Sequence, residues 1–167
     1  MNQINRSIIE AFLPEFDQEM ASTRAILALV PDNILDWKAH ETLHSIRWNA
    51  SHLADTLSWV DVTLNETSFD VAPIDGPAHE VPLLETAAAI VEAFDQNLAT
   101  AQELFRSATD ESLAVEWTLL QAGETLFTVP RSSLIKNLFI NHMIHHRAFL
   151  IAYLRINGVE CPHLYGG

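Results

Sequence analysis

The sequence predicts an all-α fold, a bundle of four long helices joined by long loops. Glycine is scarce, with 5 of 167 residues, so tight turns should be few and long helices are favoured. Nearly half of the residues (49%) are apolar, which is enough for the buried core of one domain, expected over residues 1–167. In four long segments the apolar residues recur at spacings of three and four, the period of a helix with one buried face.

The first two helices are expected over residues 5–30 and 43–64. Pro14 interrupts the first pattern, so we expect a short lead helix to break before the main one. Thr42 is the candidate N-cap of the second helix. The apolar seam of this second helix consists of Leu43, Ile46, Ala50, Leu53, Leu57, Val60 and Leu64.

A long loop is expected over residues 65–81, followed by a third helix over residues 82–107. Pro82 suits the first turn of that helix because its missing N–H has no partner there in any case. Loops of this length are uncommon in a minimal bundle and are more often functional.

The fourth helix is expected over residues 132–157, with Ser132 or Ser133 as its cap and Gly158 at its end. Between the third and fourth helices, residues 116–120 and 125–129 flank a short turn, a pattern that indicates a small hairpin before the last helix.

Charge and cysteine content exclude several classes of function. The formal net charge is −13, and an acidic surface repels phosphate backbones and anionic membranes, so neither nucleic acid nor membrane is expected as a partner. Cys161 is the only cysteine, which rules out an intramolecular disulfide and multi-cysteine zinc sites and fits the cytoplasm. We find no signal peptide and no apolar run of about 18 residues that would span a membrane.

His142 and His146 are the first candidates for a functional site. Their spacing of four places the two rings on one helix face, with Cβ atoms about 5–6 Å apart, so both can bind one ion. At 100° per residue they fall in the middle of an apolar stripe and should point into the bundle. The members of that stripe are Ile135, Leu138, Phe149, Tyr153 and Ile156.

His52 is the candidate for a third metal ligand. It lies beside the seam of the second helix, and Trp48 and Trp59 share its stripe. Asp55, one turn later, is the candidate for orienting a ring or for acting as a base. Three neutral histidines at one point would leave open coordination positions, as in reactive rather than structural metal sites.

Other interpretations of these residues remain open. His142 and His146 could be core histidines that hold no metal, and His145 could replace His146 in a pair spaced by three. The remaining histidines fall in loops or at helix starts and are interpreted as surface residues; they are His40, His44, His79 and His163.

Several segments resemble the DinB/YfiT-like family, which shares only its name with the DNA-repair polymerase. Residues 141–147 (NHMIHHR), followed by residues 153–155 (YLR) and 157–162 (NGVECP), resemble the last-helix signature of this family. Residues 31–37 (PDNILDW) and 49–53 (NASHL) resemble its first helical junction. Residues 13–19 (LPEFDQE) and 124–130 (ETLFTVP) resemble one bacterial branch of the family.

The resemblance implies a four-helix bundle, often a homodimer, that holds one divalent metal through His52, His142 and His146. It also implies zinc, nickel, iron or manganese as the metal. Some relatives transfer low-molecular-weight thiols or isomerise maleylpyruvate with a thiol cofactor. Relatives commonly carry Gly-Gln after the HHR run, where this chain has Ala148 and Phe149. This departure leaves the implied metal site unchanged but removes a glutamine that could hydrogen-bond a substrate or water, so the resemblance does not establish a shared substrate chemistry.

Two functions are therefore expected. The first is a metal-dependent enzyme, a thiol S-transferase or a hydrolase, that acts on a small-molecule substrate with or without a thiol cofactor. The second is a non-catalytic metal-binding or stress-response protein that acts through its dimer surface.

Overall fold

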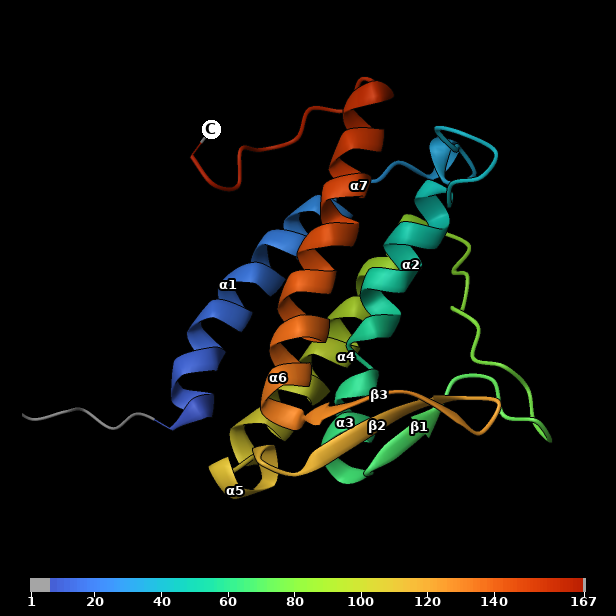
Figure 1. The fold of residues 1–167 in the computed structure, drawn as a ribbon. Coiled ribbons are helices and arrows are strands. Elements are labelled where there is room, and N and C mark those ends of the chain that lie inside the picture. The colour runs from blue at the N-terminus through green and yellow to red at the C-terminus, as the bar shows by residue number, and fades with distance from the viewer. Residues whose placement is uncertain (1–6, 167) are drawn as a thin grey trace, which may run out of the picture.

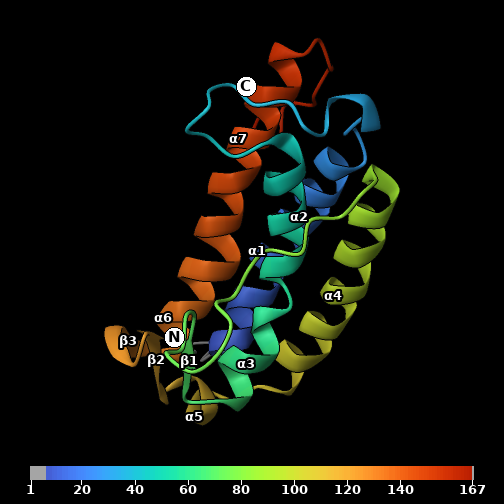
Figure 2. The same cartoon turned by 90° about the vertical axis from the view of Figure 1, so that its right-hand side faces the viewer.

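The computed structural model describes residues 7–166, and the predicted helical class is confirmed in them. The four longest helices are α1 (Ile8–Leu27), α2 (Ile46–Thr56), α4 (Ala87–Ser107) and α7 (Met143–Ile156). They lie side by side, with α2 against α4 and α7, and α1 against α4 and α7 (Figures 1 and 2). The core between them is filled by large apolar side chains, among them Phe16, Leu53, Phe94, Phe105 and Leu150.

Shorter elements make the protein more than a pure four-helix bundle. These are α3 (Trp59–Asn65), α5 (Asp110–Leu113), α6 (Arg131–Lys136) and the 3₁₀ helix Asp32–Ile34. Beside one end of the helices lies a sheet of three strands, in the order β1-β2-β3 (Figure 1).

The predicted hairpin is confirmed as β2 (Glu116–Gln121) and β3 (Glu124–Pro130), which pair antiparallel. Ala122 (φ 52°) and Gly123 (φ 78°) form the turn, and two consecutive positive φ values are those of a type I′ turn. The sequence interpretation missed β1 (Ser68–Asp70), which pairs parallel with β2. The Asp70 carboxylate accepts the backbone N–H groups of Ala122 and Gly123 and so ties the turn to β1.

The expected break at Pro14 is wrong, because α1 continues through this residue. Pro14 lies on the exposed face, where water can bond the carbonyl oxygen that the missing N–H leaves without a partner. The helix begins with a capping box between Ser7 and Glu10. The expected start at Asn5 lies outside the described residues.

The second expected helix is divided into α2 and α3 at Leu57 and Ser58. Its N-cap is Ser45 rather than Thr42, and the Ser45 hydroxyl accepts the N–H of Trp48. The predicted seam is buried from Ile46 to Val60, whereas Leu43 lies before the helix and is exposed.

The third helix starts five residues later than expected, at Ala87 with Thr86 as its N-cap. Pro82 therefore belongs to the loop over residues 71–86, which runs along α2 (Figure 2). Ser51 accepts the N–H of Leu84, and Arg47 donates to the carbonyl oxygens of Leu84 and Glu85. These bonds fasten the loop to α2.

The fourth expected helix is a continuous run of α6, the π-helical turn η2 (Asn137–His142) and α7. Neither Ser132 nor Ser133 caps it, because Pro130 occupies the N-cap position. The end at Gly158 is confirmed: its φ is 79°, and the N–H of Val159 bonds the carbonyl oxygen of Leu154 in a Schellman arrangement.

The expected apolar stripe on this helix is wrong in two respects. The π turn winds less than 100° per residue, so positions before it do not continue the face of those after it. The buried face of α7 carries Met143, Arg147, Leu150 and Leu154, whereas Phe149 is 38% and Ile156 66% exposed. His142 and His146 consequently lie at the flank of the core and are half-buried.

Candidate metal centre

His52, His142 and His146 converge at one point. Each offers one ring nitrogen, and these nitrogens all lie within 4.8 Å of one another. The Nε2 atoms of His52 and His142 are 2.8 Å apart. His52 comes from the middle of α2, His142 from the end of the π turn and His146 from the first turns of α7, so the packing of α2 on α7 builds the cluster.

Asn49, which the sequence interpretation did not single out, fixes the ring of His146. Its Oδ1 lies 3.2 Å from His146 Nδ1, while its Nδ2 donates to the carbonyl oxygen of Ser45 at 2.9 Å. Because this second bond directs Oδ1 at the ring, Nδ1 of His146 carries the proton and Nε2 keeps its lone pair. Metal-binding histidines are commonly oriented by such an acceptor on the other ring nitrogen.

Trp48 packs against the ring of His52. The two rings stack with their centroids 4.6 Å apart, and the exposed ring of His44 covers the opposite face of Trp48 at 3.6 Å. Nδ1 of His52 is buried and has no hydrogen-bond partner within residues 7–166.

All three rings are held in the neutral state that binds metal. Burial, followed by the neighbouring histidines, lowers the pKa of His52 to about 4 and that of His146 to about 3. Burial and then His145 lower the pKa of His142. At neutral pH the three imidazoles are therefore uncharged, and each keeps one ring nitrogen with a lone pair.

The arrangement fits a divalent ion. With no ion between them, two Nε2 atoms 2.8 Å apart need a shared proton. Around a tetrahedral ion with bonds of about 2.0–2.1 Å, nitrogen atoms stand roughly 3.3 Å apart, so small ring movements convert the cluster into three ligands. The three rings are half-buried.

Asp55 does not contact the three histidines through a hydrogen bond in the described structure. Its Oδ2 instead lies 3.0 Å from Nε2 of His79. His79 lies at the surface, as expected, and its pairing with Asp55 leaves the side chain 28% exposed. His40 and His163 are exposed, as expected.

His145 and Phe149 lie at the outer edge of the cluster. The exposed His145 contacts the ring of His146 edge-on at 5.2 Å, and it does not replace His146 in the cluster. The ring of Phe149 contacts His145 and Tyr153. Phe149 therefore lies beside the candidate centre.

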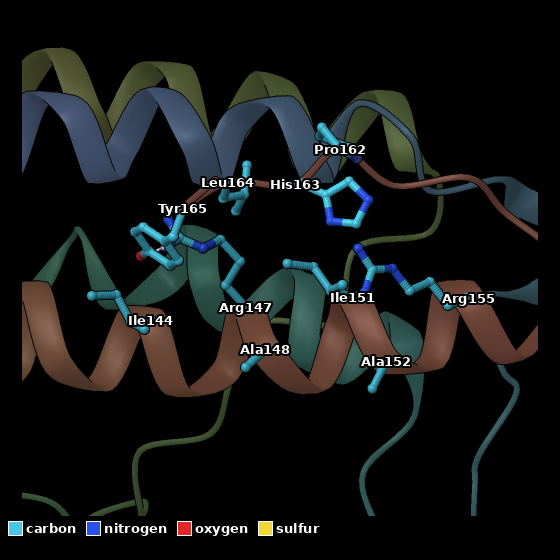
Figure 3. A pocket seen from close by; sticks show the side chains of 10 residues that line it. All are labelled: Ile144, Arg147, Ala148, Ile151, Ala152, Arg155, Pro162, His163, Leu164 and Tyr165. Atoms are coloured by element: carbon cyan, nitrogen blue, oxygen red, sulfur yellow. Dashed lines mark hydrogen bonds between the residues drawn. The ribbon is translucent and has the colours of Figure 1, made fainter. Parts of the chain in front are cut away.

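A second polar cluster lies on the other side of α7. Arg147, 1% exposed, bonds the carboxylate and the carbonyl oxygen of Glu19 and the hydroxyl of Thr23. The Tyr165 hydroxyl contacts Arg147 of α7 (Figure 3). It also donates to Glu19 of α1, so the C-terminal segment is fixed to both helices. A cavity of about 440 Å³ lies between this segment and α7, and none of the three converging histidines lines it.

The whole chain, residues 1–167, matches the DinB family. The chain belongs to the DinB family. Two solved structures of DinB-like proteins resemble it: one from Bacillus cereus ATCC 10987, with 23% identity and a TM-score of 0.70, and YjoA from Bacillus subtilis, with 17% identity and a TM-score of 0.67.

The similarity to both solved structures extends over nearly the full length. The alignments cover 93% and 92% of this chain and 97% of each DinB-like protein. At these identities the likeness establishes the shared fold. No match was found among curated proteins. Within residues 7–166, no helix has both the length and the apolar character to cross a membrane.

Proposed function

We propose that this DinB family member binds one divalent metal ion through His52, His142 and His146 and uses it to activate a nucleophile. The observation that carries the proposal is the convergence of three neutral ring nitrogens within 4.8 Å. Three protein ligands leave positions for a water, a thiol or a substrate, which is typical of catalytic rather than structural sites.

Zinc or nickel is the proposed metal, with iron and manganese as the alternatives. Imidazole ligands suit zinc, nickel, copper and iron, and the histidine set alone does not select among them. When bound, the ion would lower the pKa of a coordinated water or thiol and make it a nucleophile near neutral pH.

The residues of the chain would hold and orient the ligands. Asn49 keeps the lone pair of His146 Nε2 directed at the ion, and Trp48 supports the face of His52. A small-molecule substrate would reach the half-buried rings from solvent. The reaction classes that fit are hydrolysis, with water as nucleophile, and S-transfer, with a low-molecular-weight thiol as nucleophile.

Turnover by metal-loaded protein tests this proposal. The protein is loaded with Zn²⁺ or Ni²⁺ and assayed with 4-nitrophenyl acetate for hydrolysis, and with glutathione, bacillithiol or mycothiol plus 1-chloro-2,4-dinitrobenzene for S-transfer. We expect turnover that His142→Ala abolishes. Metal binding without turnover above that variant would contradict the enzymatic proposal and favour a non-catalytic metal-binding role.

We also propose that the protein is a cytoplasmic homodimer, as the family resemblance implies. Sedimentation equilibrium of the full chain tests the assembly: a mass near twice 18.7 kDa is the expected result, and a monomer at all concentrations would contradict it.

A further inference from the structure

The cavity between α7 and the C-terminal segment has the size and the lining of a small-molecule site. Its volume is about 440 Å³, and ligand pockets of proteins commonly measure about 300–1,000 Å³ and combine mostly apolar walls with a few polar groups. Apolar residues form most of its lining (Figure 3); they are Ile144, Ala148, Ile151, Ala152, Pro162 and Leu164. None of the three converging histidines is among the lining residues, so the cavity is separate from the proposed metal centre.

The cavity extends along about three turns of α7. The lining residues of this helix run from Ile144 to Arg155, which at 1.5 Å per residue are roughly 16 Å apart along the axis. A ligand that reaches both ends must therefore be elongated. An aliphatic chain has this shape, whereas a compact ring would leave one end empty.

The buried cation at one end of the cavity is already paired. Arg147 bonds the carboxylate of Glu19, and the Tyr165 hydroxyl contacts both side chains. This end therefore offers a ligand no unpaired charge. With Ile144 and the ring of Tyr165 in its lining, it suits the apolar part of a ligand.

The other end of the cavity carries a cation without an acidic partner. Arg155 makes one long hydrogen bond, 3.5 Å to the carbonyl oxygen of Cys161, and no carboxylate pairs with it within residues 7–166. Its guanidinium lies beside the ring of His163 (Figure 3). Glu160 lines the adjoining recess rather than this cavity. In a chain of net charge −13, an unpaired guanidinium at the end of an apolar cavity selects for an anionic group.

We propose that this cavity binds an aliphatic monocarboxylate of medium chain length, with its carboxylate on Arg155 and His163 and its chain along α7 toward Ile144. The planar guanidinium can donate two parallel hydrogen bonds to a carboxylate, and the ring of His163 adds a further N–H donor. The chain of the ligand covers apolar surface of α7 and of the C-terminal segment, and removal of this surface from water drives binding.

Titration calorimetry of the full-length protein with decanoate, below its critical micelle concentration, tests the site. We expect saturable binding of one decanoate per chain. Each buried CH₂ group should strengthen binding about fourfold, so affinity should rise steeply from hexanoate through octanoate to decanoate. Decanol, which has the same chain and no charge, should bind at least about fivefold more weakly. No saturable binding, or equal affinities for decanoate and decanol, would overturn the proposal.

Arg155→Met tests the head-group contact, because it keeps the length of the side chain and removes the charge. Its affinity for decanoate should fall about fivefold to tenfold, while its affinity for decanol should stay unchanged. Arg106→Met, at an exposed arginine of α4, is the matched control and should bind decanoate like the wild type. Equal losses in both variants would reveal a general effect of charge and overturn the role of Arg155.

Ala152→Trp tests the place of the chain, because it adds a large side chain to the cavity from an exposed position of α7. We expect it to abolish decanoate binding, whereas Ala99→Trp, at an exposed position of α4, should not. In methyl NMR spectra of the wild type, decanoate should shift the signals of Ile144, Ile151 and Leu164. Full binding by Ala152→Trp, or shifts confined to other methyl groups, would overturn the proposed site.

Metal loading separates this site from the three-histidine centre. Since none of the converging histidines lines the cavity, the metal-free and the Zn²⁺-loaded protein should bind decanoate equally well. Binding that requires the metal would place the carboxylate on the ion instead and overturn its assignment to Arg155.

Discussion

Asn49 is the residue on which the orientation of the proposed metal centre most depends. It is 3% exposed, and both ends of its amide are used, with Nδ2 on the carbonyl oxygen of Ser45 and Oδ1 on the ring of His146. A lone asparagine in a helix gives no signal in the sequence, because its role arises only where α2 meets α7.

Replacing Asn49 should weaken metal binding. Loss of such an orienting partner typically costs 10–100-fold in metal affinity, so we expect Asn49→Ala to bind Zn²⁺ about 10–100-fold more weakly in competition titrations. The exposed control Asn65→Ala should stay within a few-fold of the wild type. Equal affinities in all of these proteins would contradict the role of Asn49.

Arg147 should matter for stability rather than for metal binding. Removing one partner of a buried ion pair leaves the other charge unpaired and costs about 3–5 kcal/mol, so Arg147→Met should lower the free energy of unfolding in urea by about that amount. Arg155→Met, at an exposed position of the same helix, should change it by less than about 0.5 kcal/mol. Adding Glu19→Gln to Arg147→Met should recover part of the loss; a further loss would contradict the pairing.

Among the elements, the π turn Asn137–His142 determines where the histidines of the last helix point. Single π turns inside α-helices occur frequently at functional sites. Here the turn ends at His142 and joins α6, which follows the hairpin, to α7, which carries the buried face. The extra residue in the π turn allows α6 and α7 each to turn its own apolar face toward the core.

Deleting exposed Asn141 should therefore disturb the metal centre. The shorter segment can form an ordinary α-helix, which removes the widened turn that ends at His142 and so shifts this ring relative to His52 and His146. We expect at least a 10-fold loss of metal affinity, whereas deletion of Ile74, 79% exposed in the loop over residues 71–86, should leave it unchanged. Wild-type affinity after the Asn141 deletion would show that the π turn does not set the ligand positions.

The sequence predicted those elements whose signals are local. Spacings of three and four predicted the long helices and the seam from Ile46 to Val60, and the Ala122-Gly123 turn predicted the hairpin. Local sequence signals did not predict structure that depends on tertiary contacts. Strand β1 forms because it pairs with β2, and α1 continues through Pro14 because this residue lies on the exposed face of the helix.

The site was predicted to a similar extent. The spacing of His142 and His146 and the family resemblance pointed to the three histidines that converge. Their surroundings were not predictable, because buried Arg147 was indistinguishable from a surface charge and the pairing of His79 with Asp55 depends on the path of a loop. The expected position of the histidines in the centre of the core was wrong because Arg147, paired with Glu19, occupies the buried face of α7. A buried ion pair of this kind depends on tertiary contacts and gives no local signal in the sequence.

For the whole molecule, burial of the histidines makes stability depend on pH. Burial lowers the pKa of His52 from the ordinary histidine value of 6.5 to about 4, and that of His146 to about 3. Between these values and 6.5 the unfolded chain binds more protons than the folded protein, so stability is fully present above pH 6.5 and is lost as the pH falls toward 4 and 3.

Thermal unfolding of the metal-free protein from pH 7.5 to 4.5 measures this dependence. We expect Tm to fall across the range, and to fall less steeply in His146→Gln, which lacks one of the two groups. An equal dependence of Tm on pH in the wild type and in His146→Gln would contradict the contribution of buried His146 to this dependence.

Metal content is the measurement that tests the proposed centre most directly. The protein is purified without a histidine tag, dialysed against Zn²⁺ or Ni²⁺ and then against metal-free buffer, and analysed for metal beside His142→Ala and the exposed control His163→Ala. We predict one ion per chain in the wild type and in His163→Ala, none in His142→Ala, and a stability gain of about 3–4 kcal/mol at a hundred- to thousandfold excess of metal over Kd. Equal metal content in His142→Ala and the wild type, or none in either, would contradict a three-histidine metal centre.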